Sequence, residues 1–345
     1  MTSAPPPELS PSPPAGARPE VLVECTEVVK TYQTAASLLG RRSMRAVDGV
    51  SFTVTAGSVM GLVGETGSGK STTGRLVLGL ERPTSGRVVF AGQDLASMSG
   101  GDLRRLRRQM QPVAQDPYSA LNGRMRVSEI LAEPFIVHRT VPKAQIRRQT
   151  EELVDLVGLP ADSLDRYPHE FSGGQRQRIV IARAIALQPR LIVCDEPLSA
   201  LDVSVQSQII NLLRRLQAEF SLTYLFISHD LGIVRLLCDT VAVMYLGQLM
   251  ELASRDALFD APAHPYTRAL LASVPVSDPL ERRSRARRPL GGEAERDPTT
   301  SQGCPFQARC PLAEEECRQR RPEWRQVEPG HFVACHLAGP GHPAA

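Results

Sequence analysis

The chain has 345 residues, enough for one large domain or two smaller ones. Its 40 lysines and arginines nearly balance 37 aspartates and glutamates, and a net charge of +3 gives no electrostatic case for binding nucleic acid. No apolar run reaches the roughly 18 residues that a membrane-spanning helix needs, and the N-terminus lacks the apolar segment of a signal peptide. We therefore expect a cytosolic protein that reaches a membrane only through partners.

The first residues of the chain predict no packed structure. Residues 1–18 are rich in proline, serine and alanine and contain few large apolar side chains. Such a composition cannot bury enough apolar surface to offset the entropy of ordering, so we expect a disordered tail. After it comes Tyr32, whose ring could stack on a purine base, although a tyrosine in such a run is more often a core or edge residue.

Residues 64–71 form the pattern Gly-x4-Gly-Lys-Ser, which is typical of a loop that binds nucleotide phosphates. The apolar run 59–63 before it predicts a buried strand, and residues 71–80 after it predict a helix. Glycines let backbone N–H groups curl around phosphate oxygens, and the helix directs its positive end at the same anion. Lys70 is expected to reach the β- and γ-phosphates and Ser71 to ligate Mg²⁺. The predicted ATP-binding residues of this loop are Gly64, Gly67, Gly69, Lys70, Ser71 and Thr72.

Two later segments extend the predicted nucleotide site. Gln115 is either a plain turn residue or a neutral ligand near Mg²⁺ and the attacking water, on a loop that can move. Residues 172–175 read Ser-Gly-Gly-Gln before a helical stretch at 176–187, and two glycines and a serine at a helix start form a second anion site. Because the chain already has one phosphate loop, we expect this second site to complete the ATP site of a partner chain arranged head to tail.

Two strand ends carry the remaining chemistry. The apolar run 191–194 ends in Asp195, placed to hold Mg²⁺, and Glu196, placed to polarise the attacking water as a general base. His229 follows another apolar run, 223–227, and would lie at the carboxyl edge of a parallel sheet, where it is a candidate contact for the γ-phosphate. The predicted catalytic residues are Lys70, Gln115, Glu196 and His229.

In their order along the chain, these motifs over residues 20–262 resemble those of ABC-type ATPase domains. The resemblance implies an α/β fold with a P-loop, RecA-like core, a small antiparallel β subdomain, and a helical subdomain at about 127–185. It also implies that Tyr32 stacks on adenine and that Asp202 lies at the nucleotide. The other predicted nucleotide-binding residues are Tyr32, Gln115, Ser172, Gly173, Gly174, Gln175, Asp195 and Asp202, and the predicted Mg²⁺ ligands are Ser71, Gln115 and Asp195.

Four stretches of the chain indicate a more specific group within the ABC-type ATPases. They are similar to the dipeptide/oligopeptide importer ATPases and comprise residues 46–52, 115–122, 194–206 and 264–271. Within that group the chain is most similar to the subunit often placed second of two non-identical ATPases. The resemblance therefore implies a second, non-identical ATPase subunit, two integral-membrane permease subunits and an extracytoplasmic solute-binding protein. It also implies a place at the cytoplasmic face of the cell membrane.

The predicted function is that of the ATP-hydrolysing, energy-coupling subunit of an ABC importer, with di- or oligopeptides as the family's default cargo. Nickel complexes and sugar conjugates remain open, since the ATPase does not touch the cargo. The alternative is a soluble ABC ATPase acting on ribosomes or DNA, but this chain has one phosphate loop and no heptad run. An exporter ATPase is disfavoured by the His-Pro-Tyr-Thr segment 264–267.

Residues 263–345 form a predicted C-terminal extension with four of the seven cysteines. Disulfides are not expected in a cytosolic ATPase, so four thiolates indicate a metal site. Their gaps of five, six and seventeen residues lack the paired Cys-x2–4-Cys hooks usual for zinc, whereas a [4Fe–4S] cluster tolerates longer spacing. The resemblance also favours the cluster, with zinc or no metal as alternatives. The predicted ligands are Cys304, Cys310, Cys317 and Cys335, while Cys25, Cys194 and Cys238 are predicted to be core residues.

Overall fold

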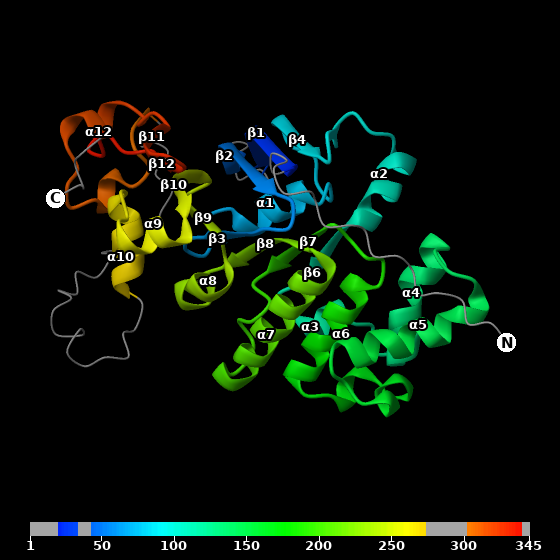
Figure 1. The fold of residues 1–345 in the computed structure, drawn as a ribbon. Coiled ribbons are helices and arrows are strands. Elements are labelled where there is room, and N and C mark those ends of the chain that lie inside the picture. The colour runs from blue at the N-terminus through cyan, green and yellow to red at the C-terminus, as the bar shows by residue number, and fades with distance from the viewer. Residues whose placement is uncertain (1–19, 34–42, 274–301, 340–345) are drawn as a thin grey trace, which may run out of the picture.

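The computed structural model describes residues 20–33, 43–273 and 302–339, and the predicted disordered tail lies outside this range. Within it the chain forms an eight-stranded and a four-stranded sheet, with helices around them (Figure 1). The large sheet has the order β11-β12-β10-β9-β3-β8-β7-β6. Its strands are β3 (Val59–Val63), β6 (Met110–Val113), β7 (Leu191–Asp195), β8 (Thr223–Ser228), β9 (Thr240–Tyr245), β10 (Gln248–Ser254), β11 (Arg325–Glu328) and β12 (His331–Val333).

The five strands β6, β7, β8, β3 and β9 are parallel, and all except the edge strand β6 are buried on both faces. Strand β3 shows why, because all five of its residues are buried and alternate between two apolar clusters. Val59 and Val63 pack with the helical side of the molecule, whereas Met60 and Leu62 pack with the four-stranded sheet. A strand buried on both faces needs an unbroken apolar run, which is the pattern found in the sequence.

The four-stranded sheet is antiparallel and has the order β2-β1-β4-β5. Its apolar face packs on helix α1 and on the large sheet through one continuous cluster that includes Val23, Phe52 and Phe90. This is the antiparallel subdomain that the sequence predicted. Its strands are β1 (Val21–Gln33), β2 (Ser43–Thr55), β4 (Ser85–Phe90) and β5 (Gln93–Asp94).

The helices follow the expected positions with small shifts that have local causes. Helix α1 ends at Val77 rather than near residue 80, because Gly79 follows with a φ of 61°, a conformation that stops a helix. Helix α6 begins at Gly173 rather than 176, because Ser172 and Gln175 form a reciprocal capping box. The helices are α1 (Lys70–Val77), α2 (Gly100–Leu106), α3 (Pro117–Ala120), α4 (Val127–His138), α5 (Lys143–Leu156), α6 (Gly173–Ile185), α7 (Val203–Phe220), α8 (Leu231–Leu237), α9 (Arg255–Asp260), α10 (Pro265–Ser273) and α12 (Glu315–Gln319), with 3-10 turns η1 (Arg107–Gln109), η2 (Ala161–Asp165), η3 (Pro168–Glu170) and η5 (Gln307–Arg309).

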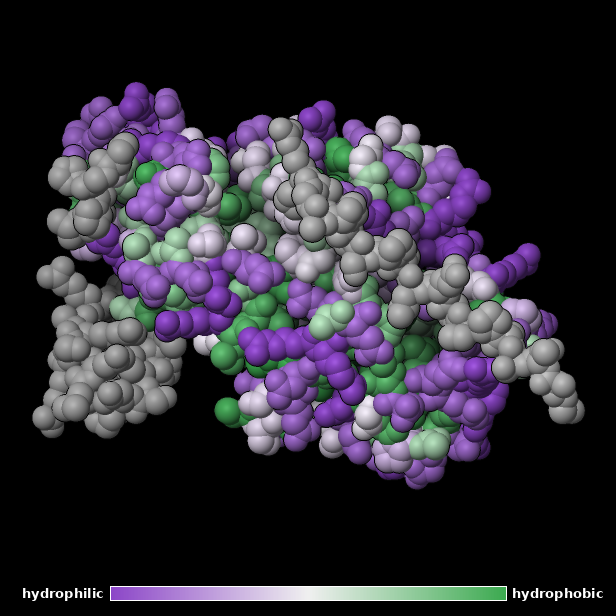
Figure 2. Space-filling view, in the orientation of Figure 1, coloured by the Kyte–Doolittle hydropathy of each residue, from purple (hydrophilic) through white to green (hydrophobic). Residues whose placement is uncertain are grey.

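Helices α4, α5 and α6 form the predicted helical subdomain, at the opposite end of the molecule from the C-terminal extension (Figure 1). None of the helices that the structure describes is long and apolar enough to cross a membrane. On the face seen in Figure 2, polar side chains cover most of the periphery and apolar ones gather toward the middle.

The C-terminal extension continues the large sheet, which the sequence did not reveal. Strand β12 pairs with β10 in antiparallel register, and β11 pairs with β12. The joint is fixed by the buried carboxylate of Glu251, which accepts hydrogen bonds from the backbone N–H groups of Ala263 and His264 and lies 2.7 Å from Nε2 of His331. This fully buried side chain with three hydrogen-bond partners holds the joint together, since the loss of a partner would leave a buried polar atom unsatisfied.

His264 gives this joint a pH dependence. Burial lowers the pKa of His264 to about 4 from its ordinary 6.5, although the charge of Glu251 acts in the opposite direction. The unfolded chain therefore takes up a proton on His264 below pH 6.5 that the folded chain does not take up. The unfolded state is thus stabilised relative to the folded state as pH falls toward 4. Through His264 alone, the free energy of unfolding is about 2 kcal/mol smaller at pH 5 than at pH 7.

We expect His264→Asn to flatten this part of the pH dependence. Asn Oδ1 can accept the Tyr266 N–H that His264 Nδ1 accepts at 3.0 Å, but it does not titrate. Urea unfolding at pH 7 and pH 5 measures the difference, with the exposed His169→Asn as the control. Equal losses of stability in wild type and His264→Asn would contradict the assignment.

Candidate nucleotide site

The phosphate loop joins β3 to α1, and its glycines are required by geometry. Gly64, Gly67 and Gly69 have φ values of 151°, 79° and 105°, in the region that favours glycine. A Cβ at Gly64 would lie 2.1 Å from the carbonyl oxygen of Met244, and one at Gly69 would lie 2.3 Å from that of Ala46. At Gly67 the corresponding space is open. The loop thus curls tightly against the neighbouring backbone at Gly64 and Gly69.

Lys70 lies inside this loop, with its side chain almost fully buried. Its Nζ donates hydrogen bonds to the carbonyl oxygens of Gly64 at 2.7 Å and Glu65 at 2.8 Å. Burial lowers the pKa of Lys70, and the carboxylates of Glu196 and Asp195 oppose that shift. The first N–H groups of α1 have no partner within the helix, so a cation and several donors converge at the place where phosphates fit.

Ser71 and Asp195 meet across the site. The hydroxyl of Ser71 donates to Oδ1 of Asp195 at 2.8 Å, joining the first turn of α1 to the end of β7. Burial raises the pKa of Asp195, and the hydrogen bond from Ser71 opposes that shift. A half-buried carboxylate beside a hydroxyl is a hard oxygen pair of the kind that Mg²⁺ prefers. The residues present therefore fit Mg²⁺.

The three predicted residues around the attacking water also come together. Oε2 of Glu196 accepts a hydrogen bond from Nε2 of Gln115 at 3.1 Å and lies 3.3 Å from Nδ1 of His229. Glu196 has a φ of 47°, which costs roughly 1–3 kcal/mol for a residue with a side chain. Its N–H donates to the carbonyl oxygen of Ile227 in β8, and this bond holds the strained residue in place.

Tyr32 is connected to the phosphate helix through a short chain of polar contacts. Its hydroxyl donates to Glu81 at 2.5 Å, Glu81 accepts from Nε of Arg75 at 2.8 Å, and Arg75 donates to the hydroxyl of Thr72 at 3.3 Å. The ammonium of Lys30 lies 5.2 Å from the Tyr32 ring centroid. Tyr32 thus lies beside α1, and its stacking on adenine stays a prediction.

The signature segment lies away from this constellation. Oγ of Ser172 accepts from the Gln175 N–H at 3.4 Å, and Oε1 of Gln175 accepts from the Ser172 N–H at 3.0 Å. In the part of the chain that the structure describes, the hydrogen bonds of these two residues stay within the signature and α6. A single chain therefore does not bring the signature to Lys70.

The signature glycines have a packing role against the start of α7. A Cβ at Gly173 would lie 3.3 Å from Leu201, and one at Gly174 would lie 2.3 Å from Cγ1 of Val205, a stiff β-branched side chain. Asp202 caps α7, accepting the Val205 N–H at 3.0 Å. Capping accounts for an aspartate at 202 without any ligand, so its role at the nucleotide stays a prediction.

Cys304 and Cys317 belong to the large apolar cluster of the helical side, half-buried Cys310 packs against it, and Cys335 belongs to a small separate cluster. The Cys304 N–H donates to the carbonyl oxygen of Cys317 at 2.7 Å, and burial raises the pKa of the Cys304 thiol to about 12. Among the described residues, no group of three or more His, Cys, Asp or Glu side chains is placed to hold a metal ion. The predicted [4Fe–4S] cluster therefore finds no support in the structure. Cys25, Cys194 and Cys238 are buried, as predicted.

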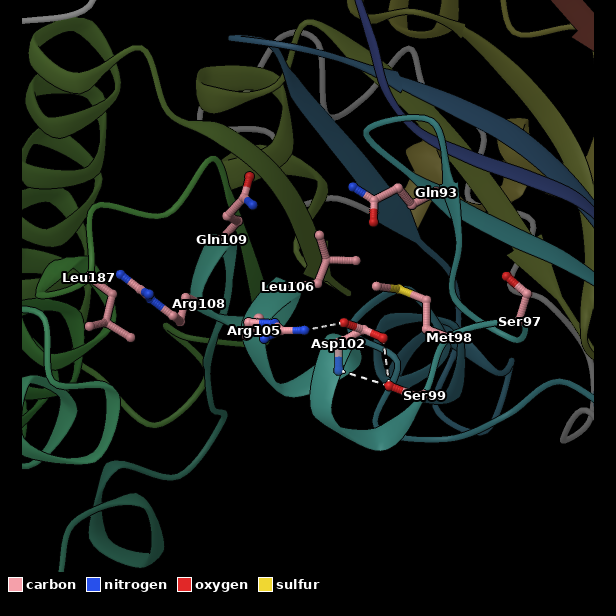
Figure 3. A pocket seen from close by; sticks show the side chains of 10 residues that line it. All are labelled: Gln93, Ser97, Met98, Ser99, Asp102, Arg105, Leu106, Arg108, Gln109 and Leu187. Carbon is pink, nitrogen blue, oxygen red and sulfur yellow. Dashed lines mark hydrogen bonds and ion pairs between the residues drawn. The ribbon is translucent and has the colours of Figure 1, made fainter.

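A pocket of about 710 Å³ lies elsewhere (Figure 3). Gln109 and Leu187 in its wall come just before β6 and β7, whereas Gln115 and Glu196 follow the same strands. The pocket is therefore at the amino ends of these strands and the nucleotide site is at their carboxyl ends. Its polar wall includes Asp102, which is paired with Arg105.

Three residues that contact the phosphate loop escaped the sequence analysis. Glu65 occupies a variable position of the motif, and Arg309 of the extension pairs with its carboxylate at 2.9 Å. Tyr266 accepts the Glu65 N–H at 3.1 Å. The sequence signal for Tyr266 was the His-Pro-Tyr-Thr segment 264–267, which indicates similarity to the importer ATPases but does not by itself indicate a contact with the phosphate loop.

The phosphate loop after β3, the Asp-Glu pair at the end of β7 and the capped signature at the start of α6 together define an ABC-type ATPase. Comparison with known proteins agrees: residues 47–199 match the model described as ABC transporter, and residues 250–317 match the one described as oligopeptide/dipeptide transporter, C-terminal region. The chain is 48% identical over 324 residues to the oligopeptide transport ATP-binding protein AppF of Bacillus subtilis, covering 93% of this chain and 98% of that one.

A putative oligopeptide transport ATP-binding protein, YkfD of Bacillus subtilis, is 49% identical over 298 residues, which are 86% of this chain and 91% of that one. The chain belongs to the oligopeptide transport ATP-binding proteins of the ABC transporter family. It is an ATPase, and ATP and Mg²⁺ fit its site.

Solved structures show the same fold. The ATP-binding cassette MJ0796, titled as a dimer in a post-hydrolysis state bound to ADP and Pi, has a TM-score of 0.61 and 26% identity, covering 68% of this chain and 99% of that one. The cbiO1 protein of Clostridium perfringens has a TM-score of 0.61 and 27% identity, covering 70% and 91%. The predicted α/β core with antiparallel and helical subdomains is thereby confirmed.

Proposed function

We propose that the chain is the ATP-hydrolysing, energy-coupling subunit of an importer for di- or oligopeptides. The observation that carries the coupling role is the hydrogen bond from Gln115 to Glu196, because it joins the loop after β6 to the general base. The peptide cargo is supported by relatives named as oligopeptide transport proteins at 48% and 49% identity. The extension supports it too, through the C-terminal region of the oligopeptide/dipeptide transporters.

Three residues would bind the phosphates of ATP and Mg²⁺. Lys70 exchanges its hydrogen bonds to loop carbonyls for bonds to the β- and γ-phosphates, which provide more negative charge. Ser71 and Asp195 are the side chains that would hold Mg²⁺, and their mutual hydrogen bond keeps both oxygens at one place. When bound, Mg²⁺ would neutralise charge developing on the transferred phosphoryl group.

Glu196 and its two neighbours, Gln115 and His229, would activate and orient the attacking water. Glu196 accepts a proton from the attacking water, and Gln115 and His229 hold its carboxylate in one orientation. His229 would also contact the γ-phosphate. Because these residues follow three neighbouring parallel strands, the site is preorganised by the sheet and the chemistry depends mainly on positioning.

A second ATPase subunit would complete the site. Ser172, Gly173, Gly174 and Gln175 stand at the N-terminus of α6, where backbone N–H groups can bind an anion, and within one chain they do not meet Lys70. A head-to-tail pair would bring this segment and Asp202 of each chain to the ATP of the other. The dimeric state named for the related cassette MJ0796 supports this arrangement. We expect the second subunit to be non-identical.

Two permease subunits and an extracytoplasmic solute-binding protein would complete the importer, and the chain would sit at the cytoplasmic face of the membrane. Tyr118 forms an exposed aromatic surface three residues after Gln115, which supports permease docking, and Ile136 and Val137 on α4 are exposed as well. The Arg176 guanidinium lies 3.9 Å from the Tyr118 ring centroid and so links this surface to α6.

The test is gentle, oxygen-free purification of the tagged chain from its own membranes, with mass spectrometry of what accompanies it. Two polytopic subunits, a second ATPase and a solute-binding protein are the expected partners, and the binding protein can then be screened with peptides. Recovery in the soluble fraction with ribosomal or DNA-bound partners would overturn the transport role and leave the ATPase assignment intact.

The [4Fe–4S] cluster in the extension stays a prediction of the sequence, supported by the number and type of the four cysteines. Oxygen-free protein should then carry about four iron atoms and matching acid-labile sulfide per chain. Cys310→Ser should abolish bound iron, whereas Cys25→Ser in the core should retain it. A wild-type chain without iron, or a Cys310→Ser variant with unchanged iron, would remove the ligand assignment.

A further inference from the structure

Glu65, the second residue of the phosphate loop, is held from three directions. Its carboxylate pairs with Nη1 of Arg309 at 2.9 Å, and its N–H donates to Oη of Tyr266 at 3.1 Å. Its carbonyl oxygen accepts from Nζ of Lys70 at 2.8 Å and from the N–H of Ser68 at 3.1 Å. The C-terminal extension thus contacts the side chain and backbone of a residue that itself contacts the ATP-binding lysine.

The Arg309 contact is sheltered and geometrically fixed. The side chains of Arg309 and Glu65 are only 10% and 26% exposed, so solvent screens their attraction less than that of a surface pair. Arg309 also donates to Oη of Tyr245 at 3.3 Å, at the end of β9. The hydrogen bond to Glu65 raises the pKa of Arg309, so the guanidinium stays charged.

The segment that carries Arg309 is itself anchored in the core. Arg309 ends the 3-10 turn η5, which lies between Cys304 and Cys310. Phe306 on the same segment is buried, with its ring centroid 5.4 Å from that of Tyr245 and 5.2 Å from that of Tyr266. The rings of Tyr245 and Tyr266 are 4.7 Å apart. This aromatic cluster leaves Arg309 and Tyr266 little freedom to move relative to the loop.

We propose that Arg309 and Tyr266 are positioning residues of the nucleotide site, which hold Glu65 so that the phosphate loop is shaped for ATP before ATP binds. The proposal rests on the ATPase assignment. The Glu65 N–H donates to Tyr266 and is therefore not available to bind phosphate, so this contact shapes the loop. Arg309 fixes the carboxylate of the same residue. The extension therefore tunes nucleotide affinity through a contact between residues that are 244 positions apart in the sequence.

Arg309→Gln tests the proposal in the full-length chain. We expect the dissociation constant of a fluorescent ATP analogue and the KM for ATP to rise about tenfold, as for the loss of a sheltered charge-assisted hydrogen bond. The kcat should change less than twofold, because Arg309 does not touch the reacting atoms. Arg309→Lys should recover part of the affinity. Glu65→Gln, which keeps Arg309 and its contact with Tyr245, should match Arg309→Gln.

The combined variant shows whether the Arg309–Glu65 pair positions the phosphate loop as one unit or whether each substitution merely loosens the structure around the loop. If the pair acts as one unit, Arg309→Gln with Glu65→Gln should bind nucleotide no more weakly than either single variant. The matched control is Arg321→Gln, which removes another ion pair between the extension and the body, that with Asp48 on β2. It should leave nucleotide affinity within twofold of wild type.

Three results would overturn the proposal: unchanged affinity in Arg309→Gln, additive losses in the double variant, or an equal loss in Arg321→Gln. Thermal unfolding of each variant separates a loss of affinity from a failure to fold. A wild-type chain that binds no nucleotide would instead remove the ATPase assignment, and the proposal with it.

Discussion

A Glu196→Gln variant is expected to bind ATP nearly as well as the wild type and to hydrolyse it about 100-fold to 10,000-fold more slowly, the usual contribution of a positioned general base. Glutamine keeps the size of the side chain, and its Oε1 can still accept the hydrogen bond that Gln115 donates at 3.1 Å. It cannot take a proton from water. Steady-state phosphate release by the assembled complex measures turnover, and a fluorescent ATP analogue measures binding.

The matched control is Glu219→Gln on the exposed side of α7, which should leave both quantities unchanged. Because catalysis and binding are measured on the same preparation, a misfolded variant is recognised by its loss of binding. Normal turnover in Glu196→Gln would eliminate Glu196 as the base and leave His229 as the remaining candidate among the residues that meet there.

Lys70→Met is expected to weaken ATP binding by about 100-fold to 10,000-fold, because two charge-assisted hydrogen bonds to phosphate are lost at roughly 1.5–3 kcal/mol each. Methionine has a similar length and fills the same buried space, so the loop glycines keep their contacts with Ala46 and Met244. The carbonyls of Gly64 and Glu65 lose a donor, and Asp195 and Glu196 lose a neighbouring cation. Titration with the ATP analogue measures the change.

Lys143→Met at the exposed start of α5 is the matched control and should bind ATP normally. Thermal unfolding should show both variants folded. Lys70→Met with wild-type affinity would show that the loop binds phosphate through its backbone alone, and the role given to Lys70 would then be wrong.

Local chemistry made much of this protein readable from its sequence. The pattern of glycines, lysine and serine at 64–71 specifies a loop because left-handed glycines and a helix start are properties of a few consecutive residues. The unbroken apolar run of β3 specifies a strand buried on both faces for the same reason. The cap at Ser172 was readable in the same way, although the three-residue error at the start of α6 shows that a capping box can extend a helix.

The assembly of the site was only partly readable. Glu196 and His229 were predicted to share a site because each follows an apolar strand, whereas Gln115 was placed near the same water in only one of two interpretations. Their meeting at 3.1 Å and 3.3 Å depends on β6, β7 and β8 lying side by side in parallel register. The positions assigned to Tyr32, Ser172 and Asp202 lie outside that meeting point.

The sequence by itself determined the nucleotide loop and the apolar strands at 59–63, 191–194 and 223–227, because each depends on neighbours along the chain. Only the tertiary structure decided that β12 continues the sheet beside β10, and that Arg309 pairs with Glu65 across 244 residues of sequence. Neither contact leaves a periodic or compositional trace, since an arginine or a three-residue strand fits many surroundings equally well. Such contacts arise when the packing of the whole chain brings distant segments within a few ångströms of each other.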